Sequence, residues 1–427
     1  MAESTLIIDG VPATRIAGAV GTPVIVYSQS QIENRLREFT ENFRSDRLRT
    51  KVVYASKAFA CGAMLELVKN AGCGLDVVSG GEMHLAKISG FPMDNVLFHG
   101  NNKTPAEICE ALHSGCGTFV IDNRLELRRL ISYAKDIKRK CRALIRINPH
   151  ISAHTHSYIM TADLDSKFGI SIDRKEEIFA MIEELCKSGY VEFTGFHAHI
   201  GSQIFEKDAY AGEIDTMAEL ISLTEKKGHR VKCLDIGGGF AAYYTSEDCP
   251  IPVPEVCQAI ISACHSAMDK YAITLETLMI EPGRSITAEA GTTLYTVGGT
   301  KNTHSKKYVF VDGGMCDNIR PALYGAKYRC DLAEKMDRDK TETVTVAGKC
   351  CESGDILIHD IPLPPAEPGD ILAVYTTGAY GYSMASNYNR IGRPAVVFAK
   401  DGKARCVIRR ETYEDLDSLE CSRDIEF

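Results

Sequence analysis

The chain alternates between short apolar runs and longer segments in which apolar residues recur every three or four positions. The first pattern is typical of buried strands and the second of amphipathic helices. Strands are predicted at residues 52–55, 74–78, 96–99, 118–121, 143–147, 194–199, 233–236 and 278–281, with a helix-like segment between each consecutive pair. Alternation indicates a parallel sheet, and eight such units preceded by a helix favour a closed (β/α)8 barrel, although a doubly wound open sheet would also alternate.

Past Ala290 the pattern changes to strands and turns, at 308–311, 343–347, 356–358, 371–375 and 396–399. This pattern predicts a β-rich C-terminal domain. Apolar runs at 6–8 and 23–27 are expected to complete that domain. The predicted fold class is therefore α/β, with a TIM-like barrel at 29–290 and a β-sandwich or barrel-like domain formed by 1–28 and 291–427.

Polar residues stand at the predicted carboxyl ends of the strands, one strand after another. They are Lys57, Asp76, His99, Asp122, Arg146, His197 with His199, the glycines 237–239, and Glu281 with Arg284. Because the chemistry of such barrels sits at the carboxyl ends of the strands, these side chains are expected to line one site.

Lys57 lies two residues past the end of the first predicted barrel strand. A lysine in a partly desolvated pocket loses its proton more readily and can attack a carbonyl, which is how Schiff-base enzymes anchor an aldehyde cofactor. An ordinary surface lysine just past a strand end is the alternative.

The three glycines at 237–239 follow the seventh predicted strand. Their backbone N–H groups could form a nest for a phosphate, with the Ser202 hydroxyl as a further donor, or the glycines could make only a tight turn. A dinucleotide fingerprint is disfavoured, because Tyr243-Tyr244 and a proline-rich segment follow where a helix would be needed.

Composition narrows the class of protein. The 427 residues are 44% hydrophobic and carry a net charge of −8, so neither a nucleic-acid nor a membrane partner is expected. No signal-like start or long apolar run is present, which predicts a cytoplasmic protein. The 16 cysteines are scattered without any CxxC pair and are expected to be mostly buried thiols.

Several motifs, in order from about residue 20 to about residue 400, resemble the diaminopimelate decarboxylase family. They are Tyr-Ala-Ser-Lys57, Gly-Leu-Asp76, His197-Ala-His199-Ile-Gly-Ser202, Gly-Gly-Gly239, Glu281-Pro-Gly-Arg284, Cys351-Glu352-Ser-Gly-Asp and Gly-Ala-Tyr380-Gly. The family is a branch of the fold-type III pyridoxal-phosphate enzymes, whose barrel is alanine-racemase-like. The stretch from Asn148 to Gly169 resembles this branch more than the ornithine branch.

The resemblance implies pyridoxal 5'-phosphate as cofactor. Lys57 would bind it covalently, Glu281 would face its pyridine nitrogen and His199 would stack on its ring. The remaining implied cofactor contacts are Asp76, Ser202, Gly239, Gly283, Arg284 and Tyr380.

The same resemblance implies decarboxylation of meso-2,6-diaminopimelate to L-lysine and carbon dioxide, the last step of bacterial-type lysine biosynthesis. The implied substrate contacts are Arg284, Arg320, Tyr324 and Tyr380, with Glu352 for the distal ammonium. Cys351 matches the family's proton donor. In relatives the Cys351–Glu352 segment comes from a second subunit, so a homodimer with shared active sites is implied.

Two paired histidines raise the alternative of a metal site. His154-x-His156 and His197-x-His199 each put two imidazoles on one face of an extended segment, but no cysteine or carboxylate spacing accompanies them. No metal is therefore expected. An alanine-racemase-like enzyme would place an arginine at the pyridine nitrogen, so Glu281 disfavours it, and a non-catalytic relative would have lost cofactor residues that are all present here.

Overall fold

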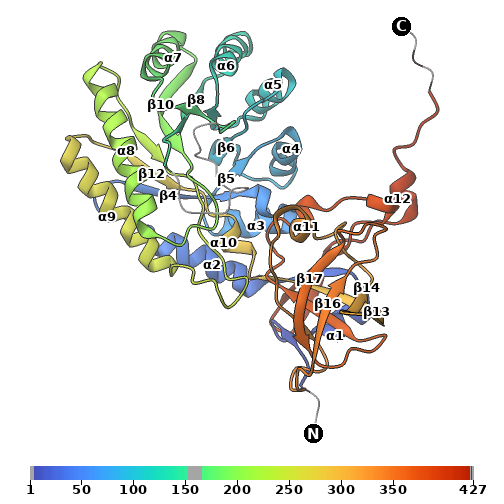
Figure 1. Cartoon of the computed structure of the whole chain (residues 1–427). Helices are drawn as coiled ribbons and strands as arrows, with labels where there is room; N and C mark the ends of the chain where they lie inside the picture. Colours follow the sequence, from blue (N-terminus) through green and yellow to red (C-terminus); the bar gives the residue numbers. More distant parts are fainter. Residues whose placement is uncertain (1–3, 152–165, 424, 426–427) are drawn as a thin grey trace. The chain divides into compact units, whose positions relative to one another are not determined.

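The computed structural model describes residues 4–151, 166–423 and 425, which form two compact units (Figure 1). The barrel unit comprises Glu33–Ala242 and Cys249–Ile286, and the β unit comprises Met1–Ile32, Tyr243–Asp248 and Thr287–Phe427. His154 and His156, the first of the two histidine pairs considered above, lie outside the described residues.

The barrel unit contains a closed ring of eight parallel strands among its described residues. In sequence order they are β4 (Arg49–Ala55), β5 (Gly74–Val77), β6 (Val96–Phe98), β7 (Thr118–Ile121), β8 (Cys141–Asn148), β10 (Val191–Ala198), β11 (Cys233–Asp235) and β12 (Thr277–Ile280). The two-residue strand β9 (Ile170–Ser171) pairs with Ile147 and Asn148 at the end of β8. Each predicted barrel strand is confirmed, and the pairing of β12 with β4 and of β10 with β8 closes the barrel rather than leaving an open sheet.

Helices follow the strands and surround them, as Figure 1 shows for α4 to α9. They are α2 (Gln29–Asn42), α3 (Gly62–Asn70), α4 (Gly80–Ile88), α5 (Pro105–Ser114), α6 (Arg124–Ile137), α7 (Lys175–Ser188), α8 (Lys207–Lys226), α9 (Val253–Tyr271) and the short α10 (Arg284–Thr287). Helix α5 is capped at its start by Thr104, whose side chain accepts from the Glu107 N–H in a capping box, and at its end by the left-handed Gly115. These caps are common helix start and stop signals.

Closure of the ring depends on a glycine in β10. The pairing of β10 with β8 shifts register between Phe193 and Gly195, and Gly195 has φ +154°. A Cβ atom at this position would lie 1.8 Å from the carbonyl oxygen of Cys233 in β11. Only glycine therefore allows β10 and β11 to approach at hydrogen-bonding distance here.

The β unit is built on a sheet in the order β17-β16-β14-β13-β3-β19-β20, with β18 also paired to β13 and β15 to β18. Its strands are β1 (Ile7–Ile8), β2 (Val11–Pro12), β3 (Val24–Ser28), β13 (Gly291–Asn302), β14 (Lys307–Val311), β15 (Cys330–Leu332), β16 (Glu342–Ala347), β17 (Ile356–Leu363), β18 (Ile371–Tyr375), β19 (Ala395–Lys400) and β20 (Lys403–Ile408). Its helices are α1 (Ala13–Val20), α11 (Arg320–Tyr324) and α12 (Tyr413–Asp417), with 3-10 turns η3 (Tyr382–Met384) and η4 (Tyr388–Arg390). The expected completion by an N-terminal strand is confirmed, because β3 lies between β13 and β19.

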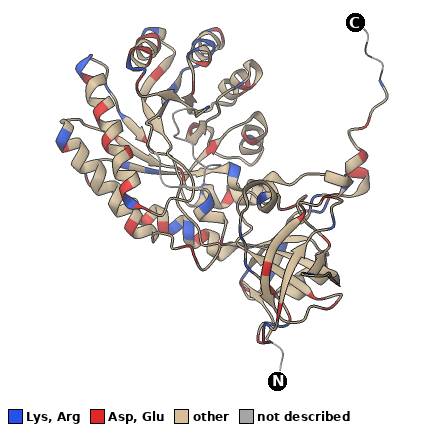
Figure 2. Cartoon of the chain, in the orientation of Figure 1, with Lys and Arg blue, Asp and Glu red and all other residues tan. Residues whose placement is uncertain are grey.

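The surface charges are mixed in sign. Figure 2 shows Lys and Arg interleaved with Asp and Glu along the outer helices, and ion pairs such as Lys207–Glu255 and Lys270–Asp215 join α8 to α9. Among the described residues, no helix combines the length and the apolar character needed to cross a membrane.

Candidate active site

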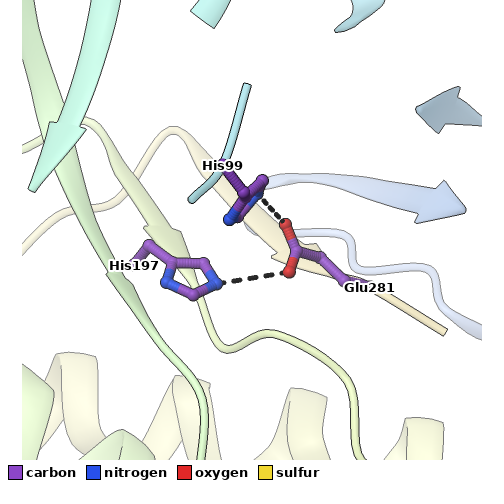
Figure 3. Close-up of side chains that lie close together, drawn as sticks. All are labelled: His99, His197 and Glu281. Carbon is purple, nitrogen blue, oxygen red and sulfur yellow. Dashed lines mark hydrogen bonds and ion pairs between the residues drawn. The ribbon is translucent and has the colours of Figure 1, made fainter. Parts of the chain in front are cut away.

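Three buried side chains meet at the carboxyl ends of β6, β10 and β12 (Figure 3). The two carboxylate oxygens of Glu281 each face a different imidazole: Oε1 lies 2.7 Å from Nε2 of His99, and Oε2 lies 3.2 Å from Nε2 of His197. The two rings stand edge to face with centroids 4.8 Å apart. Residues 99, 197 and 281 are thus brought together by the barrel from strands far apart in the sequence.

Burial and the contacts among the three side chains together determine the protonation of His99, His197 and Glu281. Burial raises the pKa of Glu281 on its own, but the contacts with His99 and His197 outweigh it and hold that pKa well below its usual value. Burial lowers the pKa of His99 to about 4 and also lowers the pKa of His197. Near neutral pH the arrangement is therefore two neutral imidazoles around an anionic carboxylate.

Two further carboxyl groups stand near Glu281. Burial, reinforced by the charge of Glu281, raises the pKa of both Asp76 and Asp235 well above the usual range. Asp235 accepts the Gly237 N–H through Oδ1 at 2.9 Å, and Asp76 Oδ1 lies 3.8 Å from His99 Nε2. Electrostatics favours a single negative charge among the buried carboxyls of Asp76, Asp235 and Glu281. Glu281 carries that charge.

Lys57 lies in the 3-10 turn η1 (Ser56–Ala58), directly after β4. Lys57 is exposed, as in the surface-lysine alternative that the sequence left open beside a partly desolvated pocket. The strand ends at Ala55, and Lys57 is the exposed residue of a turn whose other two residues, Ser56 and Ala58, are buried. Its charge acts on nearby groups, lowering the pKa of His199 after the larger effect of burial.

The glycine loop after β11 forms a close-packed turn. Gly239 has φ +92°, and a Cβ atom there would lie 2.6 Å from the carbonyl oxygen of Gly201. The N–H of Gly238 donates to Nδ1 of His199 at 3.2 Å, which fixes the ring of that histidine. The loop therefore has no room for side chains and brings its backbone next to His199.

Arg284 and Ser202 lie together on the same unit. The Arg284 guanidinium donates to Ser202 Oγ from Nε at 3.2 Å and from Nη2 at 3.0 Å. Gly283 is buried, and a Cβ atom there would lie 2.9 Å from the Cβ of Ala55. The structure thus gathers Asp76, His199, Ser202, Gly239, Glu281, Gly283 and Arg284 in the barrel unit, with Lys57 on the adjoining turn.

The remaining predicted site residues belong to the β unit. Arg320 is the first residue of α11 and is buried, with Nη1 donating to the hydroxyl of Tyr328 at 2.6 Å. Its guanidinium carbon lies 5.0 Å from the ring of Tyr244 and 6.0 Å from that of Tyr380. No carboxylate pairs with Arg320 in the described part of the chain, and its Nε has no hydrogen-bond partner there. Tyr324 ends the same helix and is exposed.

Cys351 and Glu352 form an exposed loop after β16. The backbone N–H of Cys351 donates to Oδ1 of Asn389 at 2.8 Å, and the N–H of Cys350 donates to Oδ2 of Asp355 at 2.7 Å. Glu352 accepts from the Gly354 N–H at 3.3 Å. The loop backbone is held at two points, and both Cys351 and Glu352 are exposed.

One side-chain group has the composition of a metal site. His99, His197 and Glu281 offer ligand atoms that lie within 4.8 Å of one another, the one such buried group found among the described residues. Two imidazoles and a carboxylate are a set that catalytic zinc uses. The direct contact of 2.7 Å between Nε2 of His99 and Glu281 is shorter than the roughly 3.3 Å that separates two ligands on tetrahedral zinc with bonds of about 2.0 Å.

Comparison with known proteins identifies the class first. Residues 29–288 match the pyridoxal binding domain of the pyridoxal-dependent decarboxylases, so the chain belongs to that class of enzymes. Within it, the chain is 45% identical over 415 residues to a diaminopimelate decarboxylase of Bacillus subtilis, covering 97% of this chain and 94% of the relative. A diaminopimelate decarboxylase of Staphylococcus aureus is 43% identical, with 96% of each chain covered. The chain belongs to the diaminopimelate decarboxylase family.

Solved structures agree with this assignment. The crystal structure of diaminopimelate decarboxylase from M. jannaschii superposes with a TM-score of 0.92 at 33% identity, covering 98% of this chain and 96% of that one. The same enzyme in complex with L-lysine gives a TM-score of 0.90 at 32% identity, covering 99% of this chain and 98% of that one.

The residues of the barrel unit fit pyridoxal phosphate, the cofactor of this class. Lys57 offers an amine for its aldehyde, and the glycine loop next to Ser202 offers a side-chain-free backbone for its phosphate. Glu281 offers an anion for its pyridinium, and Oδ1 of buried Asp76 has no hydrogen-bond partner among the described residues. These are the donor and acceptor types that the cofactor needs.

His99 and His197 were predicted at strand ends without a role in the cofactor site, and Asp235 was covered only by the predicted strand 233–236. The available signal was their position at the ends of the third, sixth and seventh barrel strands. That two of them converge on Glu281 depends on barrel closure and could not be derived from spacing.

Proposed function

We propose that the protein decarboxylates meso-2,6-diaminopimelate, giving L-lysine and carbon dioxide. The observation that carries the choice of substrate is Arg320, a buried guanidinium with three tyrosine rings around it and no carboxylate partner among the described residues. A buried arginine without an anion favours binding one, and its planar fork suits a carboxylate. Diaminopimelate has a second carboxylate at its far end, whereas ornithine and lysine have only an ammonium there.

The chain's own groups have separate tasks in this proposal. Lys57 would bind the cofactor through its amine, and Gly239, Ser202 and the backbone of Gly283 and Arg284 would hold the phosphate. His199, whose Nδ1 accepts the Gly238 N–H, would pack on the cofactor ring. Pyridoxal phosphate supplies the electron sink that accepts the electron pair left by the departing carbon dioxide.

The β unit contributes substrate recognition and proton transfer. Arg320, Tyr324 and Tyr380 are proposed to bind the distal carboxylate together with Arg284, and Glu352 to bind the distal ammonium. The thiol of Cys351 is proposed to deliver a proton to the α-carbon after carbon dioxide leaves. The exposure of Cys351 supports a role in reaching a second subunit.

A spectrum and a product assay test the function. We expect the purified protein to show the visible band of a lysine-bound cofactor, and Lys57→Ala to lose it. Carbon dioxide and lysine should form from meso-diaminopimelate, and much less carbon dioxide from ornithine, arginine or lysine. Equal release from ornithine would contradict the role of Arg320, and absence of the band would contradict the cofactor.

A homodimer with shared active sites is proposed as well. Lys57→Ala and Cys351→Ala should each be nearly inactive, and mixing them under conditions that exchange subunits should restore about a quarter of full activity, because half of randomly paired dimers are mixed and each has one intact site. No recovery, or an active monomer in size-exclusion chromatography, would contradict shared sites.

The domain limits and the cellular role complete the proposal. A cofactor-binding domain at 29–290 is supported by the family match over 29–288. Lysine biosynthesis in the cytoplasm is the role expected of this reaction, and a fluorescent fusion together with lysine auxotrophy of a deletion strain would test both.

A further inference from the structure

We propose that His99 and His197 are positioning residues that fix the orientation of the Glu281 carboxylate for its contact with the cofactor ring. The inference rests on the function proposed above and extends it to two residues that act through a third.

The geometry of the three side chains is the first argument. Each oxygen of Glu281 has its own imidazole nitrogen, at 2.7 Å and 3.2 Å, and Figure 3 shows the two rings approaching the carboxylate from different strands. The terminal torsion of a glutamate is broad, so a carboxylate without partners does not keep one plane. Rotation of this carboxylate would disrupt both contacts at once.

The burial of the rings is the second argument. His99 is 3% exposed and His197 is 1% exposed, so neither can exchange Glu281 for water. The Nδ1 atom of His197 is buried and has no hydrogen-bond partner in the described part of the chain. A buried N–H without an acceptor is rarer than an unpaired acceptor, so the proton of His197 is assigned to Nε2, which faces Glu281.

The charge state of the rings is the third argument. Because burial lowers the pKa of both histidines, both rings are neutral near pH 7: His197 donates to Glu281 from Nε2, and Nε2 of His99 lies in contact with the other carboxylate oxygen. Neutral rings orient the carboxylate without cancelling its charge. Glu281 therefore keeps its full negative charge for a protonated nitrogen of the cofactor ring. An imidazolium in place of either neutral histidine would weaken that attraction.

The test is a double-mutant cycle with Glu281→Gln. His99→Leu and His197→Leu should each lower kcat by about 10- to 100-fold, the range seen when partners that orient a functional group are removed. They should also weaken cofactor binding in an absorbance titration, while KM for diaminopimelate changes less than about twofold. In the Glu281→Gln background the same leucine substitutions should lower kcat further by less than about twofold.

Two controls separate positioning from a structural role. His197→Gln, whose amide can donate from near Nε2, should recover most of kcat, whereas His197→Asn should not, and this pair decides the question if the leucine variants misfold. His84→Leu, at an exposed position of α4, should leave all readouts unchanged.

Effects of His197→Leu that persist in the Glu281→Gln background would overturn the inference, as would unchanged kcat and cofactor affinity. A parent enzyme that binds the cofactor but prefers ornithine would contradict the proposed substrate alone, since the cycle can be measured on that amino acid. A parent enzyme that binds no pyridoxal phosphate would overturn both proposals.

Discussion

Lys103 and Glu126 form a fully enclosed ion pair in the barrel unit, with Nζ 2.7 Å from Oε1. The same ammonium donates to the carbonyl oxygens of Gly100 at 2.9 Å and Val120 at 2.7 Å. An ammonium has three protons, so all its donors are used. Lys103 belongs to the run of polar residues after β6. It is thus a structural residue that ties the loop after β6 to β7 and α6.

Replacing Lys103 with methionine tests this role. The change leaves Glu126 buried without a cation, and we expect the free energy of unfolding to fall by about 3–5 kcal/mol in denaturant titrations. The double variant Lys103→Met, Glu126→Leu should recover part of the loss, because no charge is then left unpaired. A loss below about 1 kcal/mol in the single variant would show that water reaches the pair.

Asp317 in the β unit predicts a pH dependence of stability. Burial raises the pKa of this carboxyl to about 7, although the Tyr295 hydroxyl and the Gly314 N–H act to lower it. Between about pH 4 and pH 7 the folded protein retains a proton that the unfolded chain releases. The contribution of Asp317 to stability therefore falls as pH rises through this window, by at most about 1.4 kcal/mol per pH unit.

Asp317→Asn should flatten this part of the stability profile, measured as the free energy of unfolding at pH 5, 6 and 7. Asp339→Asn, at an exposed position of the same unit, is the matched control and should leave the slope unchanged. Identical slopes in the parent and Asp317→Asn would mean that Asp317 is ionised in the folded protein.

Asn389 holds the loop that carries Cys351. Its side-chain oxygen accepts the Cys351 N–H, and its backbone is left-handed at φ 53°. The following Arg390 pairs with Asp417 and Glu420, which ties the turn to the C-terminal segment. Asn389→Gly keeps the backbone shape but removes the acceptor, so Cys351 should be alkylated faster and kcat should fall severalfold.

Asn389→Asp keeps an acceptor and should behave nearly like the parent. The rate of Cys351 modification by iodoacetamide, followed by mass spectrometry of the peptide, is independent of turnover. If the glycine and aspartate variants are modified at equal rates, the hydrogen bond does not control the loop.

Metal removal should leave the enzyme active. Dialysis against a chelator, followed by assay with added pyridoxal phosphate, should retain full activity, because His99, His197 and Glu281 are assigned to contacts with one another. Loss of activity that zinc restores would assign the three residues to a metal instead.

The sequence predicted the parts of the molecule that local patterns determine. All eight barrel strands follow from periodicity, and the polar residues that the sequence placed at the ends of those strands belong to the barrel unit. Strand β13 escaped prediction because its threonines and the pair Gly298-Gly299 interrupt any apolar run. It is stabilised by pairing with β3, β14 and β18, contacts that join distant segments.

The site was predictable as a set of residues but not as a set of contacts. The motif resemblance selected Glu281. Its two imidazole partners come from the ends of β6 and β10, and only closure of the barrel determines how close these strand ends lie to Glu281. Exposure of Lys57 was likewise not readable from an apolar strand, since it depends on where the turn after Ala55 points.

The position of β3 has a consequence for synthesis of the chain. All five residues of this strand are buried in the finished protein, and both of its neighbours, β13 and β19, begin at Gly291 or later. The barrel strands, which end at Ile280, leave the ribosome first. At about 5–20 residues per second, β3 waits on the order of tens of seconds without a partner. A nascent chain interrupted in this interval would expose an apolar strand edge, a natural binding site for a chaperone.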